Sequence, residues 1–471
     1  MNMRFSIAVL LTMALPFFMI AGCAKVSMPE ENLAERLQYD DTASRRYQVD
    51  DLWWKTYQDD RLNRLVDEAL KNNVDLAQAA VKVNRALYQA GLLATDLVPQ
   101  FSGSLDASAR KNVKNGGPST RSAGGSLSLS YELDLWRKVA DSVSAQQWEY
   151  KATVEDKEAA RQTLIGSTVD AYFHLAYLND AIGASEDNLK NYRSIYETVR
   201  AKQMAGKVAS VETAQARQSV LSAENTLNDY QSQHKSAEQT LRNLLNLKPN
   251  QPLGLEKATL AKLRLPGLDL NIPLAVLANR PDLKAAEMRL EKAFKQVEEA
   301  EKGWLPSITL GAAIGSTGDS LKTAFNLPVG SGSVNINLPF LQWDKVRLNL
   351  RISEADFESV RLDLEKALTT ALNEVDTYYS QYDLSRESLA NTRKKYISDI
   401  EVGQYYRDRY QAGKAELSDW LSALNTVNSS RLSALNGLYQ TVQYEVMTQK
   451  AMSGRYVDLL ALAEAASEAV K

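Results

Sequence analysis

The chain has very few of the residues that usually build metal or disulfide sites. Among 471 residues there is one cysteine, Cys23, and there are two histidines, His174 and His234. A single cysteine forms no disulfide within its chain, and a Cys/His metal site needs about four such ligands. Each histidine stands alone in a helix-like pattern, which indicates a packing or surface position. No phosphate-binding loop or nucleophile elbow occurs in its strand–helix context. We therefore expect neither an enzyme nor a bound cofactor or metal.

Glycine and proline are also scarce, at 22 and 12 residues. Such low usage excludes a collagen-like or linker-like chain and a turn-rich all-β protein. Apolar residues make up 44% of the chain, which is too many for a disordered protein. The 55 Lys and Arg residues against 58 Asp and Glu residues leave a formal net charge of −3. Because there is no excess of positive charge, we expect no nucleic-acid partner.

A short apolar run opens the chain. Residues 7–20 are almost entirely apolar, which is too short for a spanning helix and is typical of the h-region of a signal peptide. The run ends in Ile20-Ala21-Gly22-Cys23, which resembles a bacterial lipobox, where the chain is cut just before an acylated cysteine. We predict a lipoprotein signal peptide at 1–22 and a lipid anchor and tether at 23–60. A plain secretory peptide with a cysteine near its cleavage site is the alternative.

Landmarks recur along the chain at a spacing of 207 residues. Four pairs share this offset: Asp75 and Asp282, Pro99 and Pro306, Trp136 and Trp343, and Gly206 and Gly413. One common offset across so long a stretch predicts two copies of a single structural unit. We place the copies at 61–248 and 280–450, with an inter-repeat linker at 249–279 and a C-terminal segment at 451–471.

Each copy contains a long stretch without proline. No proline occurs in 119–248 or 340–471, and a proline inside a helix costs about 3 kcal/mol. The sequence therefore predicts long helices, each ending at a glycine and followed by an amphipathic returning helix. The expected ranges are 136–204, 211–247, 343–412 and 417–447. Each copy thus forms a long helical hairpin, with its tip at Gly206 in the first and at Gly413 in the second.

The rest of each copy alternates between apolar and polar residues. This period of two predicts a β-hairpin at 101–132 and another at 307–340, with strands of about the length that a tilted membrane strand needs. Four strands cannot close a barrel, because about eight is the minimum. An open edge in lipid would leave backbone groups unpaired. Three chains sharing one barrel would supply twelve strands. Two soluble hairpins packed on a helical bundle are the alternative.

Several short segments resemble those of one known family. They are Arg280-Pro281-Asp282-Leu283, Leu305-Pro306-Ser307-Ile308, Tyr131-Glu132-Leu133-Asp134-Leu135-Trp136 and Tyr410-Gln411-Ala412-Gly413. In order and spacing they are similar to the TolC family of outer-membrane channel-tunnels, in its lipoprotein branch of the NodT and OprM type. The resemblance implies an α+β membrane protein: a homotrimeric channel-tunnel with a twelve-strand β-barrel continued by a long periplasmic α-helical barrel. It also implies docking to an inner-membrane pump through a periplasmic adaptor protein, and no catalytic residues.

The resemblance assigns three residues to a periplasmic gate. Glu212, six residues after the first tip glycine, and Tyr410, three before the second, match residues that link neighbouring hairpins. Asp419 matches an acid that rings the pore entrance and favours cations. The alternative for Glu212 and Asp419 is an ordinary exposed acid at a helix start, where its interaction with the helix dipole stabilises the helix by a few tenths of a kcal/mol.

The tip glycines also have a role in the related proteins. The resemblance implies that Gly206 and Gly413 form the tips that dock the adaptor, whereas plain helix caps are the alternative. Two positions depart from the family pattern: Ser422 stands where a second ring acid is usual, and Ala415 where an arginine is common. These departures imply fewer charged links in the closed state and a weaker cation preference.

Three functions remain compatible with these patterns. The first is a passive exit duct in the outer membrane for small molecules and drugs, within a tripartite efflux system. The second is the outer-membrane channel of a type I protein secretion system, for which the same pattern is expected because the partner selects the cargo. The third is a pore-less coiled-coil lipoprotein scaffold of the cell envelope.

Overall fold

The computed structural model describes most of the chain after residue 45. The described residues are 27–28, 32–37 and 46–458, with gaps at 112, 115, 117, 250, 254, 256–257, 262, 264, 269–271 and 321. The expected signal peptide and the expected lipid-bearing Cys23 lie outside them. The described chain forms two compact units. Leu92–Gln146 and Leu290–Val360 form one unit, and most of the remaining chain forms the other. Both copies of the repeat therefore contribute to each unit.

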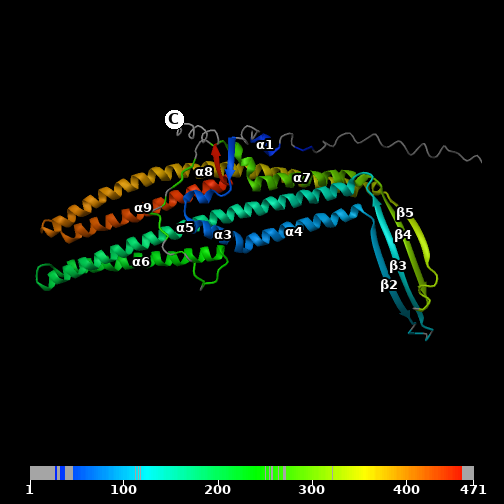
Figure 1. Cartoon of the computed structure of the whole chain (residues 1–471), viewed down its shortest axis with the longest axis horizontal. Helices are drawn as coiled ribbons and strands as arrows, with labels where there is room; N and C mark the ends of the chain where they lie inside the picture. Colours follow the sequence, from blue (N-terminus) through cyan, green and yellow to red (C-terminus); the bar gives the residue numbers. More distant parts are fainter. Residues whose placement is uncertain are drawn as a thin grey trace, which may run out of the picture. The chain divides into compact units, whose positions relative to one another are not determined.

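A four-stranded antiparallel sheet dominates the first unit (Figure 1). Its strands in spatial order are β2 (Gln100–Arg110), β3 (Thr120–Leu133), β4 (Ser307–Gly318) and β5 (Val329–Asn337). They lie within one residue of the two segments in which alternation predicts hairpins. The hairpins join through β3 and β4, so a single sheet combines both copies of the repeat.

The register gives this sheet one apolar and one polar face. Phe101 lies opposite Leu129, while the hydroxyl oxygens of Ser102 and Ser128 lie 2.7 Å apart on the other face. Successive side chains along a strand point to opposite faces, so the sequence alternation becomes two surfaces of different polarity. The apolar face is largely uncovered in one chain, where Leu105 is 82% exposed.

Seven α-helices of thirteen or more residues make up most of the described chain. They are α3 (Asp60–Asn72), α4 (Val74–Ala94), α5 (Lys138–Met204), α6 (Ser210–Leu244), α7 (Pro281–Glu301), α8 (Trp343–Gln411) and α9 (Leu417–Ala451). The four longest begin and end within four residues of the ranges that the proline-free stretches predict. In the described part of the chain, no helix combines the length and the apolar character needed to cross a membrane.

A polar joint connects β3 to α5. The carboxylate of Asp134 accepts the backbone N–H groups of Val139 at 3.0 Å and Ala140 at 2.8 Å. These bonds satisfy donors that the first turn of a helix leaves without partners. The indole N–H of Trp136 donates to the carbonyl oxygen of Pro306 at 2.8 Å. The segment after β3 is therefore tied to the segment before β4, at the same level of the sheet.

In the second unit, α5 and α6 form one antiparallel hairpin, and α8 and α9 form the other (Figure 1). Arg193 of α5 pairs with Glu224 of α6 at 2.7 Å. Lys395 of α8 donates to Ser430 of α9 at 2.8 Å. These contacts show that the two helices of each hairpin lie side by side. Since α5 and α6 belong to the first copy and α8 and α9 to the second, each copy of the repeat contributes one hairpin.

The segment before α3 is folded into this unit rather than serving only as a tether. Strand β1 (Tyr47–Asp50) pairs with β6 (Arg455–Asp458), which lies in the predicted C-terminal segment. The 3-10 helix η2 (Trp53–Tyr57) buries its aromatic side chains in a core shared with α5 and α9. Trp53 and Trp54 are each only 1% exposed. One small sheet thus joins the segment just before η2 to the end of the described chain.

Candidate functional site

The two helical hairpins end in turns of the same geometry. Gly206 has φ = 72° and Gly413 has φ = 70°, in the left-handed region that favours glycine. In each turn the N–H of the residue after the glycine donates to the carbonyl five residues earlier, at 2.9 Å and 2.8 Å. This bond closes a helix end in the manner of a Schellman motif. A Cβ added to either glycine would meet no atom within 4 Å, so both turns present an open surface.

A contact across the hairpin recurs at the same position in both copies. In the first copy, Thr213 Oγ1 donates to Gln203 Oε1 at 2.6 Å. In the second, the rings of Tyr410 and Trp420 stack with their centroids 5.3 Å apart. Gln203 and Tyr410 are separated by 207 residues, as are Thr213 and Trp420. The repeat therefore closes both tips with the same pair of positions, through a hydrogen bond in one copy and an aromatic stack in the other.

Tyr410 also joins the two hairpins of a chain to each other. The Nζ atom of Lys202, at the end of α5, lies 4.5 Å from the centre of the Tyr410 ring, a cation–π distance. Around this contact, buried side chains of α5, α6 and α9 form an apolar cluster that includes Val199 and Leu417. The hydroxyl of Tyr410 is buried and has no hydrogen-bond partner among the described residues of one chain.

Glu212 and Asp419 occupy equivalent positions in the first turns of α6 and α9, 207 residues apart. Asp419 Oδ2 accepts the backbone N–H of Glu416 at 3.3 Å, as part of a capping box. Among the described residues of one chain, no hydrogen bond or ion pair joins Glu212 to Tyr410. Within a single chain, the structure thus places Tyr410 in the apolar core of the tips and leaves both acids at helix starts.

Three other side chains shape the tips, and the sequence patterns did not single them out. They are Lys202, Trp420 and Arg409. Arg409 Nη1 donates to the hydroxyl of Tyr405 at 2.7 Å, and Nη2 donates to the carbonyl of Lys414 at 3.1 Å, bracing the second turn. Lys202 and Arg409 are themselves 207 residues apart. A position-by-position comparison of the two copies would have found both cations.

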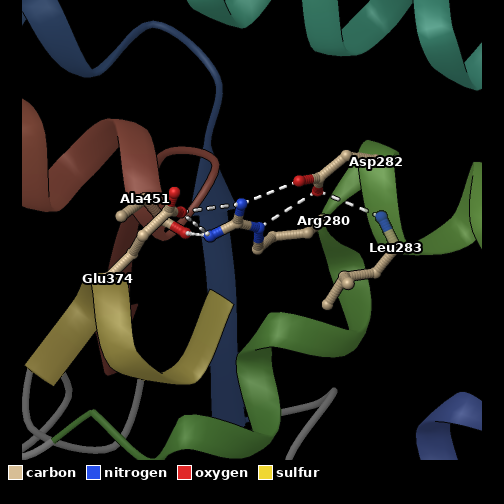
Figure 2. Close-up of polar contacts among 5 residues, drawn as sticks. All are labelled: Arg280, Asp282, Leu283, Glu374 and Ala451. Atoms are coloured by element: carbon tan, nitrogen blue, oxygen red, sulfur yellow. Dashed lines mark hydrogen bonds and ion pairs between the residues drawn. The ribbon is translucent and has the colours of Figure 1, made fainter. Parts of the chain in front are cut away.

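Figure 2 shows a second polar centre, built around the buried Arg280 at the start of α7. Its Nε and Nη2 atoms donate to the Asp282 carboxylate at 3.0 Å and 2.7 Å. Its Nη1 atom donates to Glu374 of α8 at 3.1 Å and to the carbonyl of Ala451, at the end of α9, at 2.8 Å. Burial alone raises the pKa of Asp282, but the hydrogen bonds and charge of Arg280 outweigh it, so the pKa is lowered.

The first copy has a smaller version of this arrangement. Asn73 Nδ2 donates to the carbonyl of Leu244, at the end of α6, at 2.9 Å. Asn73 and Arg280 are 207 residues apart, and so are Leu244 and Ala451. Each copy therefore ties the start of the helix that precedes its β-hairpin, α4 or α7, to the end of its last helix. The first residue of the Arg280-Pro281-Asp282-Leu283 motif thus has a structural role in the repeat.

Replacing Arg280 by Ala should destabilise the helical unit by about 2 to 3 kcal/mol, because Asp282 and Glu374 lose their buried cationic partner. Thermal unfolding of the purified protein, followed by circular dichroism, measures the effect. Arg407→Ala is the matched control, since its pair with Asp408 at 3.4 Å is exposed and is expected to contribute less than about 1 kcal/mol. Equal melting temperatures for the two variants would contradict the assigned role of Arg280.

The two histidines are engaged in packing contacts. The ring of His174 stacks on Tyr439 at a centroid distance of 5.0 Å, and burial lowers the pKa of His174. His234 Nε2 lies 3.0 Å from Asn179 Oδ1. Over the residues that the structure describes, no three His, Cys, Asp or Glu side chains are grouped in a way that could hold a metal ion.

Comparison with known proteins gives consistent matches. The model of the family described as outer membrane efflux protein matches residues 65–247 and again 272–453, so it covers each copy of the repeat once. Toxin and drug export protein A of Aggregatibacter actinomycetemcomitans is 45% identical over 93% of this chain and 96% of its own length.

Solved structures show the same fold. The Neisseria gonorrhoeae MtrE outer membrane channel in its open state is 25% identical, with a TM-score of 0.77 over 92% of this chain and 98% of that chain. The Campylobacter jejuni CmeC outer membrane channel is 24% identical, with a TM-score of 0.79 over 92% of this chain and 95% of that chain.

The two family matches begin 207 residues apart, at the offset that also relates the tip turns and the Asn73 and Arg280 contacts. They cover more than half of the chain. The family consists of transport channels of the outer membrane and is not a family of enzymes. The chain belongs to the outer membrane efflux protein family and is an exit duct for efflux in the outer membrane.

Proposed function

We propose that three copies of the chain assemble into one channel, with a shared twelve-strand barrel in the outer membrane. The edge strands β2 and β5 support this proposal, because each has a single neighbouring strand within the sheet. Unpaired strand edges in lipid cost several kcal/mol for each unsatisfied group, so the edges need strands from other chains. The exposed apolar face, with Leu105 at 82% and Val334 at 65%, suits contact with acyl chains.

The position in the cell envelope follows from the same assembly. Cys23 is the lipidation site, and its acyl chains add to the attachment of each chain to the outer-membrane lipid. The helical hairpins form a tunnel in the periplasm. Gly206 and Gly413, whose turns present open surfaces, are the docking points for a periplasmic adaptor protein that connects to an inner-membrane pump. The duct itself is passive, and the pump supplies the energy.

The exported cargo is proposed to be small molecules, drugs among them. A relative that is 45% identical is named a toxin and drug export protein, which supports this choice. The same name favours a second candidate, the outer-membrane channel of a type I protein secretion system. Deleting the gene and measuring both drug susceptibility and the amount of secreted protein would separate the two candidates.

Conductance tests the duct directly. Purified protein inserted into planar lipid bilayers should conduct in steps of one size, and cross-linking before denaturing electrophoresis should give a trimer. The scaffold alternative predicts an absence of both signals. A folded protein that neither conducts nor forms trimers would therefore overturn the proposed channel.

The gate is proposed to involve Glu212, Tyr410 and Asp419, with the buried hydroxyl of Tyr410 bonding to Glu212 of a neighbouring hairpin. Tyr410→Ala removes this bond together with the stack on Trp420, and it should raise single-channel conductance several-fold. Tyr410→Phe keeps the ring and loses only the hydroxyl, so it should open the channel less and match Glu212→Ala. Single-channel recording of the three variants measures their conductances, which should be highest for Tyr410→Ala and equal for Tyr410→Phe and Glu212→Ala.

Two outcomes would count against this gate. Wild-type conductance for Tyr410→Phe would show that the hydroxyl makes no link between hairpins. Wild-type conductance for Tyr410→Ala would remove Tyr410 from the gate altogether. The double variant Glu212→Ala with Tyr410→Phe serves as the control, because two residues that share one bond should give no additional opening when combined.

A further inference from the structure

One end of the sheet carries a run of cationic side chains. Between Asp106 and Glu132 the chain has no acidic residue and four basic ones: Arg110, Lys111, Lys114 and Arg121. All four lie at or beside the turn between β2 and β3, and all are exposed. The loop between β4 and β5 adds Asp319 and Lys322, whose formal charges cancel. The formal charge of this hairpin end is therefore positive.

The strand register places these cations relative to the apolar face. Arg121 lies opposite Ala109, in the row that follows Ala107 and Ala123 on that face. Arg121 is therefore the first charged side chain beyond the apolar rows. Long basic side chains at the edge of an apolar surface can lay their aliphatic part on it and direct the charge toward polar headgroups.

Exposed apolar side chains accompany the cations. A Cβ added to Gly125 would lie 3.2 Å from the Phe325 ring, which places Phe325 on the apolar face next to that glycine. Phe325 nevertheless remains 61% exposed, and Leu327 of the same loop is 78% exposed. In the β2–β3 turn, Val113 is 94% exposed between Lys111 and Lys114. Aromatic and basic residues at the rim of an apolar band are typical of a membrane–water interface.

We propose that this hairpin end binds phosphorylated lipid headgroups of the outer leaflet. Lys111, Lys114 and Arg121 contact the phosphates, while Phe325 and Leu327 contact the acyl region. The combination favours a lipid over a free phosphate ion, because a phosphate ion has no apolar part that could contact Phe325 and Leu327. The inference rests on the proposed function, in which the chain enters the outer membrane from the periplasm at the start of β2 and returns at the end of β3, so that the turn between these strands faces the cell exterior.

Binding of a fluorescent, diphosphorylated lipid A to the purified full-length channel in detergent tests the proposal. The triple variant Lys111→Gln, Lys114→Gln and Arg121→Gln should bind it about a hundredfold more weakly, since each basic residue near a lipid surface contributes about 1 kcal/mol, or about fivefold in affinity. The control variant removes the same charge from exposed helix positions, as Lys190→Gln, Lys366→Gln and Lys394→Gln, and should bind as the wild type does. Dephosphorylated lipid A should bind the wild type as weakly as lipid A binds the triple variant.

Several results would overturn the proposal: equal affinity of the triple variant and the wild type, an equal loss in the control variant, or equal binding of the dephosphorylated lipid. Displacement of the probe by millimolar inorganic phosphate would show a site for the ion alone and would also overturn it. Conductance of the same samples distinguishes a failure of the lipid site from a failure of the proposed duct. A triple variant that conducts and binds lipid A as the wild type does would overturn the lipid site and leave the duct in place. If the triple variant does not assemble, Arg121→Gln alone should weaken binding about threefold to fivefold.

Discussion

Gly413→Trp should abolish export while leaving the trimer intact. The glycine lies at the outermost turn of the second hairpin, with φ = 70° and no atom within 4 Å of an added Cβ. An indole ring at this position would project from the turn and keep a docking partner from approaching the backbone. Drug susceptibility of a strain that carries the variant should equal that of the deletion strain. Cross-linking and bilayer conductance should report a normal trimer.

Two matched variants separate blocked docking from backbone strain. Gly413→Ala imposes the same left-handed strain, of about 1 to 2 kcal/mol, but adds only one methyl group. We expect it to export normally. Gly183→Trp adds the same ring at a helix position with equally open surroundings, away from the tips, and should also export normally. Export by a well-assembled Gly413→Trp channel would show that the turn is not a docking surface.

Glu445→Gln should stabilise the helical unit at alkaline pH. Glu445 of α9 is fully buried, and burial raises the pKa of its carboxyl group to about 7. The hydroxyl of Tyr57 donates to its Oε1 atom at 3.3 Å, while Oε2 has no hydrogen-bond partner among the described residues. The hydrogen bond from Tyr57 and the charges of Arg455 and Arg386 lower the pKa, but they do not offset burial. Above pH 7 the core therefore holds a carboxylate whose burial is only partly offset.

The sign of the pH dependence follows from the raised pKa. The folded state holds the proton of Glu445 more tightly than the unfolded state does. Its contribution to stability is therefore fully present below the unfolded pKa near 4.5 and is lost as the pH rises toward 7. Glutamine carries no charge at any pH. The gain in unfolding free energy from Glu445→Gln should thus be about 2 to 3 kcal/mol larger at pH 8 than at pH 5.

Melting temperatures of the two proteins at pH 5 and pH 8 measure this difference. The exposed Glu387→Gln on α8 is the matched control and should shift the melting temperature equally at both pH values. A gain from Glu445→Gln that is independent of pH would mean that the carboxyl group titrates alike in the folded and unfolded chains. The assignment of Glu445 as a buried titratable group in the core would then be wrong.

Long-range contacts explain why the sequence predicted some elements well and missed others. The helix ranges follow from the absence of proline and the strands from alternation, and both are local signals. The pairing of β1 with β6 joins Tyr47–Asp50 to Arg455–Asp458, which lie about 400 residues apart in the sequence. Local signals therefore predict only a tether for Tyr47–Asp50. Nothing in Tyr57 or Glu445 alone indicates that they meet, because 388 residues separate them.

Individual contacts at the hairpin tips are likewise not predictable from local sequence. The resemblance identified Tyr410, and the structure places it between Trp420 and Lys202, which no local pattern connects to it. Asp419 was assigned to a pore ring, and within one chain it completes a capping box with Glu416. These roles depend on which helices pack side by side. The 207-residue offset indicates such contacts only when each residue of the first copy is compared with its equivalent in the second copy.

The sequence by itself determined the two-fold repeat, the long helical hairpins with glycine tips and the two β-hairpins, because each depends on residues close together in the chain. Only the tertiary structure decided that both β-hairpins join in one sheet and that Arg280 ties α7 to the end of α9. It also decided that Lys202 and Tyr410 connect the two tips. Such contacts arise when distant segments bury their apolar faces together, and that burial brings into reach polar and aromatic partners that have no local relation in the sequence.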